Sequence, residues 1–374
     1  MKKILVVFGT RPEFIKLLPV ILSFKSSKKK CKLLVCNTSQ HKDLVKPLID
    51  FYNIKIDYNL NVLKKGQSLS QLASKIISKV DLILKKNNLD CIVVQGDTST
   101  TIFSSLAAFY NRIKIFHVEA GLRTYNLNSP WPEELNRQFT SKIASHNFAP
   151  TPLSKKNLVN EGYGPRNITI TGNTVIDLLL LTLKLIGKKK LIKRKLKSKF
   201  SKLSNNKFKI LLSVHRRENF GSSIKEIFKA INNLSKKPNI QIIYCIHSNP
   251  YVKKAEKKFL KKRENIVCFN SLDYISFVYL MNSVDLIMSD SGGIQEEAPS
   301  IGKPHLILRE FTERPEAIDQ GSAALVKLNE TSIVNKFNQI YKNKDVLSKM
   351  SKKRNIYGKG NAAKLISEKI LNLI

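Results

Sequence analysis

KILVVFGTRPEFIKLLPV, residues 3–20, runs from a short apolar segment through a glycine turn into a helical stretch. The apolar segment Lys3–Phe8 has the length and composition of a buried strand. The same order of apolar run, turn and helical stretch returns along the chain, and it is typical of parallel sheets with crossover helices. Further strands of a first series are expected at residues 32–36, 91–94, 114–118 and 147–149, and those of a second series at 168–171, 209–214, 241–246, 265–268, 286–289 and 304–308.

The length of 374 residues exceeds what one hydrophobic core usually organises. We therefore expect an α/β fold with two Rossmann-like, doubly wound domains, joined near residues 172–180. The expected division is an N-terminal domain at 1–172, a C-terminal domain at 173–358, and a helix at 359–374 that packs back on the N-terminal domain.

The formal net charge is +37, but it does not by itself indicate a nucleic-acid-binding protein. Lysines are spread along the whole chain, and a general preference for Lys on solvated faces explains this better than a binding groove does. The exception is the segment 184–209, where twelve residues are Lys or Arg and no acid lies between Asp177 and Glu218. This basic segment could contact an anionic membrane surface or RNA, although a solvated helix or linker is the favoured interpretation. It lacks the interleaved aromatic residues that stack bases, so we expect no specific nucleic-acid partner.

The longest apolar stretch, residues 178–186, is far short of the roughly 20 residues that a membrane span requires. The first residues, MKKILVVFGT, contain an apolar run too short for a signal peptide. We therefore expect a cytoplasmic protein without a transmembrane segment. Five scattered cysteines form no CxxC pair or zinc-ligand spacing, which favours buried reduced thiols and no metal site.

Polar motifs follow the predicted strands of both series. In open parallel sheets, ligands bind beyond the carboxyl ends of the strands, so we expect these motifs to line one cleft between the two domains. The motifs are GTRPEFIK, QGDTSTT, EAGLRT, HRRENFG, HSNP, DSGGIQEE and REFTERPE.

Several of these motifs suit a nucleotide diphosphate. Ser291, Gly292 and Gly293 precede a helical stretch, where bare N–H groups and the helix dipole favour an anion. Glu297 lies one turn later and is either a ribose-binding carboxylate or an ordinary first-turn acid. Arg11 and Lys16 offer positive charge in the first domain. The chain has no GxGxxG motif and no Walker lysine, which lowers the expectation of a dinucleotide cofactor or ATP.

A second group of residues suits proton transfer. Asp97, Glu119 and Glu133 are three carboxylates from separate predicted strand ends, and moving a proton between the two faces of a sugar needs at least two such groups. Arg137 lies close to Glu133 in the sequence, so salt-bridged helix capping is the alternative interpretation. His215 follows a strand and can contact a diphosphate or protonate a leaving group.

The ordered motifs resemble those of the non-hydrolysing UDP-N-acetylglucosamine 2-epimerases over nearly the whole length. The matching blocks are GTRPEFIKLLPV, QGDTSTT, HVEAGLRT, SPWPEELNRQ, FAPT, TGNTVID, HRRENFG, DSGGIQEEAPSIGKP and TERPEA. The resemblance implies a fold of glycosyltransferase-B type and a homodimer. It also implies interconversion of UDP-GlcNAc and UDP-ManNAc through a 2-acetamidoglucal intermediate, with no cofactor, in support of surface polysaccharide synthesis.

The resemblance also assigns roles to residues at matching positions. It gives acid/base work to Asp97, Glu119 and Glu133 of the N-terminal domain, and it gives assistance in the departure of UDP to His215. UDP binding belongs mainly to the C-terminal domain. The full substrate-binding set is Arg11, Lys16, Arg137, Ser291, Gly292, Gly293, Glu297 and Arg314.

Two positions depart from the pattern of that family. Tyr125 stands where a glycine is common, and Gly66 stands where many bacterial members have an arginine. That arginine helps to bind a second, activating UDP-GlcNAc. Asp43 replaces another polar contact of this allosteric site, whereas its remaining contacts match Gln40, Gln67, Arg216 and His247. Substrate activation is therefore a hypothesis to be tested by kinetics.

Four alternatives stay open at this point. A hydrolysing relative would release free ManNAc and UDP, and a related UDP-2-acetamido sugar could replace UDP-GlcNAc. A retaining glycosyltransferase would read the nucleotide sugar in a similar way, but three acids in the first domain count against it. A protein that binds nucleic acid or a membrane surface through the segment 184–209 is the alternative from another class.

Overall fold

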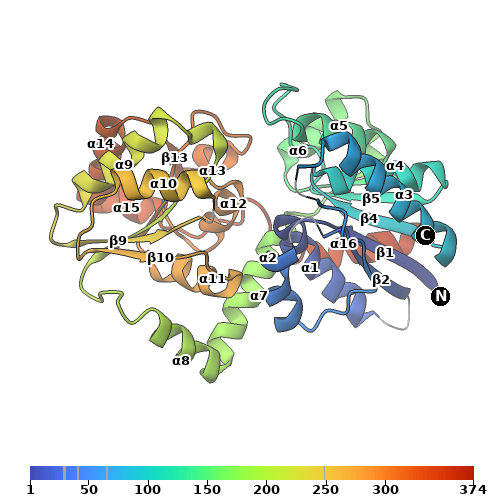
Figure 1. Cartoon of the computed structure of the whole chain (residues 1–374), viewed down its shortest axis with the longest axis horizontal. Helices are drawn as coiled ribbons and strands as arrows, with labels where there is room; N and C mark the ends of the chain where they lie inside the picture. Colours follow the sequence, from blue (N-terminus) through green and yellow to red (C-terminus); the bar gives the residue numbers. More distant parts are fainter. Residues whose placement is uncertain (28–30, 40–41, 65, 248) are drawn as a thin grey trace. The chain divides into compact units, whose positions relative to one another are not determined.

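The computed structural model describes residues 1–27, 31–39, 42–64, 66–247 and 249–374. By its contacts the chain divides into two compact units, which Figure 1 shows with the chain coloured from blue to red. Unit 1 comprises Met1–Leu178 and Tyr357–Ile374, and unit 2 comprises Leu179–Ile356. Each unit has its own parallel sheet, and the expected α/β class with two doubly wound domains is confirmed.

The sheet of unit 1 has seven strands in the order β3-β2-β1-β4-β5-β6-β7. All of its neighbouring strands pair in parallel. The strand order reverses on the two sides of β1, which is the arrangement that leaves a ligand-binding crevice beyond the carboxyl ends of the strands. The strands are β1 (Lys2–Phe8), β2 (Cys31–Asn37), β3 (Tyr58–Asn59), β4 (Cys91–Gln95), β5 (Lys114–Val118), β6 (His146–Ala149) and β7 (Ile168–Ile170).

The central strand β1 is apolar on both faces because helices cover both. Leu5 and Val7 belong to one buried cluster with residues of α3 and α4, whereas Ile4 and Val6 point to the opposite face. The helices of unit 1 are α1 (Arg11–Ser26), α2 (Lys42–Phe51), α3 (Leu69–Asn87), α4 (Ser99–Tyr110), α5 (Glu133–Ile143), α6 (Pro152–Asn160), the first part of α7 (Thr174–Lys188), and α16 (Ala362–Leu373). A 3-10 turn at Pro165–Asn167 precedes β7.

Unit 2 repeats this plan with a six-stranded parallel sheet in the order β10-β9-β8-β11-β12-β13. Its strands are β8 (Phe208–Ser213), β9 (Ile240–Cys245), β10 (Ile266–Phe269), β11 (Leu286–Ser289), β12 (His305–Ile307) and β13 (Ala323–Leu325). Its helices are the rest of α7, α8 (Lys190–Lys199), α9 (Ser222–Leu234), α10 (Pro250–Phe259), α11 (Tyr274–Ser283), α12 (Gly292–Ser300), α13 (Glu316–Asp319), α14 (Glu330–Lys342) and α15 (Lys344–Met350), with a 3-10 turn at Arg217–Asn219. Side chains of α9 and α14 bury one face of this sheet.

The chain leaves unit 1 and returns to it at one place. The backbones of Gly172 and Gly358 are so close that a Cβ added at Gly172 would lie 2.7 Å from the Cα of Gly358. The Asn173 N–H donates to the carbonyl of Tyr357 at 2.5 Å. Asp177, in the first turn of α7, accepts the N–H groups of Ala362 and Ala363 at 3.3 and 2.9 Å, and so caps α16. These contacts attach the start of α7 to unit 1, so the division by contacts falls a few residues beyond residue 172.

The helix α16 packs on α1, where the hydroxyls of Ser23 and Ser367 lie 2.6 Å apart. Its apolar face, which includes Ile366 and Ile370, is fully buried. The last turns of the described chain therefore complete the core of unit 1.

Some sequence-based expectations need correction. The segment 168–171 was expected in the second series, but β7 pairs with β6 and is the edge strand of unit 1. The short strands β3 and β13 were not expected at all. Four cysteines are buried, but Cys268 is exposed. Burial raises the pKa of the Cys36 thiol to about 12.

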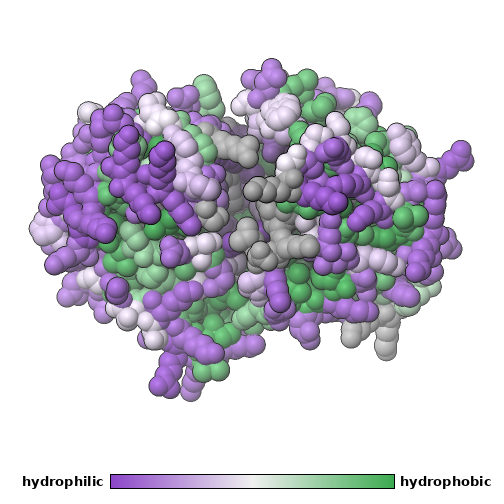
Figure 2. Space-filling model, viewed as in Figure 1, coloured by the Kyte–Doolittle hydropathy of each residue, from purple (hydrophilic) through white to green (hydrophobic). Residues whose placement is uncertain are grey.

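The surface reflects the excess of lysine, and hydrophilic residues cover much of the face seen in Figure 2. The basic segment 184–209 forms the end of α7 and all of α8, and it continues into β8. Lys199 pairs with Asp273 and Lys209 pairs with Asp285, whereas Leu196 and Phe200 pack inward. Within the described ranges, no helix combines the length and the apolar character needed to cross a bilayer.

Candidate functional site

Glu119 lies at the carboxyl end of β5, where side chains from three other segments of unit 1 meet it. Its carboxylate forms an ion pair with Lys16 of α1 and accepts a hydrogen bond from the Gln95 side chain at the end of β4. The Asn173 side-chain amide donates to it at 2.7 Å. The carboxylate is thus held in one position and is only 8% exposed.

The backbone at Glu119 is in the left-handed region, with φ of 64°. The neighbouring strand end also turns sharply, because Gly96 has φ of 73° and donates its N–H to the carbonyl of Val118 at 3.0 Å. A side chain at Gly96 would meet the Glu119 carboxylate at 3.5 Å. That distance is an ordinary contact, so it is the positive φ at position 96 that favours glycine beside this acid.

His117 supports this arrangement from the core. It is fully buried and lies 2.7 Å from the carbonyl of Gly96 through its Nε2 atom. Burial lowers the pKa of His117 to about 4. The ring is therefore neutral at physiological pH and acts as a structural neighbour of the site.

A second ion pair of unit 1 lies beyond the end of β4, the strand that pairs with β5. Arg137 of α5 forms an ion pair with Asp97, and the Asn136 side chain donates to the Asp97 carbonyl at 2.9 Å. Arg137 also lies 3.3 Å from the buried carboxylate of Glu134. The guanidinium thus connects α5 to the end of β4.

Glu133 begins α5 and is partly exposed, whereas its neighbour Glu134 is buried. Glu134 accepts the N–H groups of Thr124 and Tyr125, both at 3.1 Å. The sequence suggested an acid at this helix start that pairs with Arg137 and caps backbone N–H groups. Glu134 makes these contacts. Glu133 faces the more accessible side of the same helix start.

The turn between β1 and α1 is organised by Glu13. This buried carboxylate accepts the N–H groups of Gly9 and Thr10 at 3.1 and 2.7 Å and the Thr98 hydroxyl at 2.7 Å. Burial raises the pKa of Glu13 above its ordinary value, although these hydrogen bonds oppose the shift. The turn fixes the start of α1, and with it the positions of Arg11 and Lys16.

In unit 2, the start of α12 lies beneath two arginines. Ser291 is the N-cap residue, and its side chain makes no capping hydrogen bond. A Cβ added at Gly292 would lie 3.0 Å from Nη1 of Arg314 and 3.3 Å from Nη2 of Arg216. Gly293 leaves more room, because its nearest neighbours would be 3.9 Å or more away. Glycine at position 292 thus lets guanidinium groups approach the positive end of a helix, which is a strong site for an anion.

Glu313 holds the arginines of this region together. It forms ion pairs with Arg314, with Arg309 at 2.8 Å, and with Arg216 at 3.9 Å. Arg314 is also held by Glu296 at 2.6 Å. Burial disfavours the charged carboxylate, but the surrounding guanidinium groups keep the pKa of Glu313 well below its ordinary value.

Glu297 is buried one turn into α12. The hydroxyl of Tyr274 donates to its Oε1 atom at 2.7 Å. Tyr274 is the first residue of α11, and it is also buried. The hydrogen bond holds the Glu297 carboxylate in one orientation.

His215 follows β8 and contacts Asp290, which follows β11. The His215 Nδ1 atom lies 3.2 Å from Oδ1 of Asp290. The ring stacks on His247, with centroids 5.0 Å apart and planes 20° apart. His215 is partly exposed, so its imidazole is accessible at this edge of unit 2.

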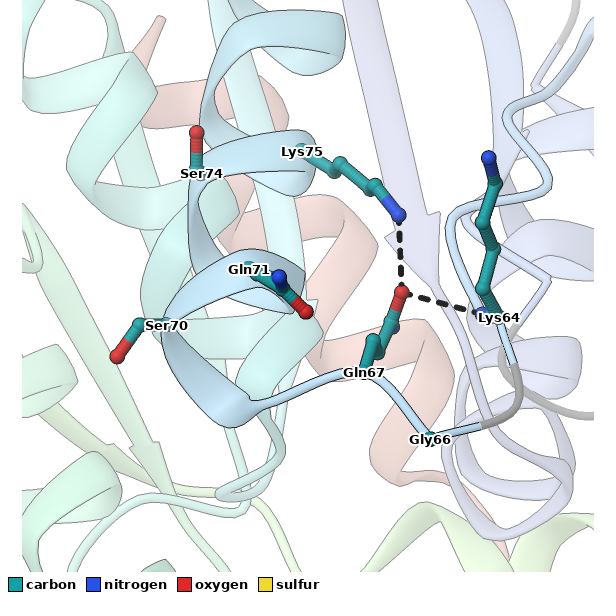
Figure 3. Close-up of a pocket in the computed structure, with 7 residues that line it drawn as sticks. All are labelled: Lys64, Gly66, Gln67, Ser70, Gln71, Ser74 and Lys75. Atoms are coloured by element: carbon teal, nitrogen blue, oxygen red, sulfur yellow. Dashed lines mark hydrogen bonds between the residues drawn. The ribbon is translucent and has the colours of Figure 1, made fainter.

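The possible activator contacts are distributed over both units. Gln67 lies in an open pocket of about 590 Å³ with Lys64, Gly66, Ser70, Gln71, Ser74 and Lys75, which Figure 3 shows. Its Oε1 atom accepts from Lys75 Nζ at 3.0 Å and from the N–H of Lys64 at 3.1 Å. Arg216 and His247 belong to unit 2, and Gln40 lies outside the described residues.

The two unusual positions both have left-handed backbones. Gly66 has φ of 78° with open space around it, and Tyr125 has φ of 58° with its side chain 60% exposed. A glycine is the less strained residue in this region. The conformation is therefore favourable at Gly66 and costly at Tyr125.

The structure gathers the predicted residues into two groups. The pairs Lys16–Glu119 and Asp97–Arg137 lie at the strand ends of unit 1, and His215, Gly292, Glu297 and Arg314 lie at those of unit 2. Sequence reasoning missed Gln95, Asn173, Tyr274, Asp290 and Glu313. Four of them, Gln95, Asn173, Asp290 and Glu313, stood inside motifs that had been singled out, whereas Tyr274 did not. Among the described residues, no cluster of His, Cys, Asp and Glu has the geometry of a metal site.

Comparison with known proteins gives a consistent result. The sequence profile of the family described as UDP-N-acetylglucosamine 2-epimerase matches residues 25–371. A UDP-N-acetylglucosamine 2-epimerase of Neisseria meningitidis is 44% identical over 99% of both chains, and one of Campylobacter jejuni is 43% identical over 100% of this chain and 97% of its own. The crystal structure of the N. meningitidis protein bound to UDP-GlcNAc superposes with a TM-score of 0.95 over 99% of this chain and 100% of that one. The structure of S. aureus MnaA with UDP is 36% identical in sequence. It superposes with a TM-score of 0.89 over 100% of this chain and 98% of that one.

Proposed function

Because the chain belongs to the UDP-N-acetylglucosamine 2-epimerase family, we propose that it interconverts UDP-GlcNAc and UDP-ManNAc without releasing the free sugar. The observation that carries this proposal is the arrangement around Glu119, a carboxylate held by Lys16, Gln95 and Asn173. A fixed carboxylate with a second one nearby, Asp97, suits proton removal and return at one carbon.

In the proposed forward reaction, a carboxylate takes the proton from carbon 2 of the sugar. The C1–O bond breaks, its electron pair goes to the diphosphate oxygen, and a double bond forms between carbons 1 and 2. The products of this step are UDP and 2-acetamidoglucal. In the reverse addition, a proton reaches the other face of carbon 2 while a diphosphate oxygen bonds to carbon 1, so no atom is lost. Asp97, Glu119 and Glu133 are the proposed acids and bases, and His215 is the proposed residue that assists the departure of UDP.

UDP is the proposed leaving group, so its negative charge must be stabilised. The proposed contacts are Arg11, Lys16, Arg137, Ser291, Gly292, Gly293 and Arg314, with Glu297 on the ribose. The start of α12 beneath Arg216 and Arg314 supports this assignment for unit 2. Fixed N–H groups and guanidiniums aimed at a developing charge often lower the reaction barrier more than any other feature of an active site. This chemistry requires neither a redox cofactor nor a metal ion.

The test is incubation with UDP-GlcNAc in deuterated water, followed by proton and phosphorus NMR. We expect a mixture of UDP-GlcNAc and UDP-ManNAc that carries deuterium at carbon 2. Free ManNAc with UDP would overturn the non-hydrolysing route in favour of hydrolysis. An unchanged and unlabelled substrate would exclude UDP-GlcNAc and favour a related UDP-2-acetamido sugar or a transferase.

We infer that the enzyme works as a cytoplasmic homodimer. Three large apolar side chains are exposed on the adjacent helices α3 and α4: Leu82, Phe109 and Tyr110. The Asn111–Asp81 hydrogen bond of 2.7 Å brings the ends of this patch together. An apolar patch of this kind suits a contact between copies. Light scattering of the variant Leu82→Glu/Tyr110→Glu should give a monomer, and a wild-type monomer would contradict the inference. The free cysteines fit a reducing compartment.

Activation by a second UDP-GlcNAc is proposed through Gln67, Arg216 and His247, with Gln40 as a fourth contact. The accessible pocket at Gln67 supports it, although Gly66 supplies no side chain there. Rates that rise sigmoidally with UDP-GlcNAc, and a reverse reaction that needs added UDP-GlcNAc, are the expected results. Strictly hyperbolic kinetics in both directions would contradict activation.

A further inference from the structure

Asp290 is a buried carboxylate that the proposed reaction does not yet use. Its side chain is 0% exposed. It accepts the N–H groups of His215 and Arg216, both at 2.9 Å, and the side-chain amide of Asn219 at 3.0 Å. It lies 3.2 Å from the imidazole Nδ1 of His215. Asp290 therefore contacts both the backbone and the ring of the residue proposed to assist the departure of UDP.

The donors around Asp290 determine its charge. The two backbone N–H groups and the amide N–H of Asn219 can only donate, so they favour the ionised carboxylate, which can only accept. Burial opposes ionisation, but the contacts with the His215 ring and the N–H groups of His215 and Arg216 keep the pKa of Asp290 below its ordinary value.

An ionised Asp290 also determines the hydrogen position on His215. Because the carboxylate has no hydrogen to donate, Nδ1 of His215 must carry the proton in this contact. The Nε2 atom is then the ring nitrogen available to a ligand, and it gains a proton only when the ring becomes an imidazolium. The arrangement matches the way in which a carboxylate orients a catalytic histidine in hydrolases.

We propose that Asp290 is a positioning residue for His215, which it holds as the Nδ1–H form so that Nε2 faces the leaving diphosphate. This inference rests on the proposed function, in which His215 assists the departure of UDP. The imidazolium donates from Nε2 to the diphosphate oxygen that receives the electron pair of the breaking C1–O bond. In the reverse direction the same nitrogen takes that proton back. The buried negative charge of Asp290 stabilises the imidazolium before the bond breaks.

Other charged and titratable groups near His215 have distinct roles. His247 stacks on its ring, and the N–H of Asn249 donates to Nδ1 of His247 at 3.2 Å. Arg216 is the next residue, and its guanidinium lies 3.9 Å from Glu313. Among these described neighbours, Asp290 is the acid in contact with the His215 ring.

The first experiment measures the wild-type protein by long-range proton–nitrogen NMR with labelled histidine. The chain has six histidines, and the His215 signals are assigned by their absence in His215→Asn. We expect neutral His215 to carry its proton on Nδ1 in the wild type and to lose this preference for Nδ1 in Asp290→Asn. A neutral ring that carries its proton on Nε2 would overturn the proposal, even if Asp290→Asn fails to fold.

The second experiment is a double-mutant cycle on kcat. Asp290→Asn should lower kcat roughly 10- to 100-fold, which is less than the roughly 10²- to 10⁴-fold that a general acid itself contributes, and should move the alkaline limb of the pH profile to lower pH. In the His215→Asn background, the same change should alter kcat by no more than about 2- to 3-fold. An equal loss in both backgrounds would show that Asp290 only supports the loop, which contradicts the proposal.

Failure of this proposal is distinguishable from failure of the proposed function. If wild-type protein does not epimerise UDP-GlcNAc in deuterated water, the proposed function fails. The NMR measurement still reports whether Asp290 controls the His215 ring. If epimerisation is present and the neutral ring carries its proton on Nε2, only the role of Asp290 fails.

Discussion

Glu119 combines a strained backbone with a fully partnered side chain. A non-glycine residue at φ of 64° costs about 1–3 kcal/mol, which the contacts with Lys16, Gln95 and Asn173 must offset. Strain held by surrounding structure is common where a side chain must take one exact orientation for function. The position of this carboxylate is therefore sensitive to change in any of its partners.

Replacing Glu119 by Gln keeps the shape of the side chain and removes its charge. We expect kcat for epimerisation to fall roughly 10²- to 10⁴-fold, because the amide cannot accept the carbon 2 proton. Deuterium incorporation at carbon 2, followed by proton NMR, measures the loss. The control is Glu368→Gln, which removes an exposed acid that pairs with Lys364 and should leave kcat unchanged. Wild-type rates of exchange in Glu119→Gln would exclude the proposed role.

Replacing Gly292 by Ala should weaken UDP binding. The new methyl group would lie 3.0 Å from Arg314 and 3.3 Å from Arg216, so the guanidiniums must move away from the start of α12. We expect the Kd for UDP to rise roughly 10-fold, which corresponds to about 1.4 kcal/mol. Titration calorimetry measures this change. The matched control is Gly187→Ala in α7, where a Cβ meets nothing within 4 Å. An unchanged Kd in Gly292→Ala would show that these arginines do not contact UDP.

A buried acid of α7, Asp177, connects this helix to α16. Asp177 caps the first turn of α16, and both helices belong to the place where the chain leaves and re-enters unit 1. Burial raises the pKa of Asp177 to about 6, although the N–H groups of Ala363 and Ala362 oppose the shift. The connection between the two helices therefore depends on pH.

The sign of this dependence follows from the raised pKa. Between about pH 4, where an unfolded Asp titrates, and pH 6, the folded protein binds more protons than the unfolded one, so the free energy of unfolding falls as pH rises. The contribution is up to about 3 kcal/mol. The variant Asp177→Asn lacks this pH-dependent contribution. Its free energy of unfolding, compared with that of the wild type, should therefore increase from pH 4 to pH 7. Urea unfolding at both pH values tests this. A difference that stays constant with pH would contradict it.

The positions of the strands were easier to predict than the pairing of each strand with its neighbours in the sheet. Buried parallel strands such as β1 and β4 contain uninterrupted apolar runs, which stand out in the sequence. The two-residue strand β3 and the three-residue strand β13 have too few residues to form a pattern. The assignment of β7 failed because nothing in Ile168–Ile170 specifies pairing with β6.

Motifs located most of the candidate residues, but not their partners. Asp97, Glu119 and Gly292 stood out because they follow strands within unusual motifs. Asn173 and Tyr274 make contacts with residues far away in the chain, and such contacts leave no local pattern. Asp290 was visible within DSGGIQEE, but its burial beneath His215 depends on the pairing of β11 with β8.

The whole molecule carries 65 Lys and Arg against 28 Asp and Glu, so its charges repel one another in the folded state. Salt should screen this repulsion, because the Debye length falls from about 10 Å at 0.1 M to about 3 Å at 1 M. The concentration of exposed cations in α8 makes the basic segment a large local contributor.

We expect the Tm to rise when sodium chloride is increased from low to moderate concentration, by roughly 2–4 °C for each kcal/mol of relieved repulsion. The variant Lys190→Glu/Lys193→Glu/Lys197→Glu should be more stable at low salt and should depend less on salt. The matched control replaces the same three residues by Arg, which keeps the charge. Scanning calorimetry measures all three proteins. A Tm that does not change with salt, or an equal salt dependence in the Glu variant, would contradict the prediction.

The close approach of Gly172 and Gly358 has a consequence for biosynthesis. Because unit 2 is inserted between residues 178 and 357, the ribosome makes all of unit 2 before it makes α16. The face of α1 that α16 covers therefore stays exposed to solvent and chaperones while about half of the chain is still being translated. A message truncated after unit 2 would yield a polypeptide with one finished half and one unfinished half, which quality-control proteases would recognise by that uncovered helix.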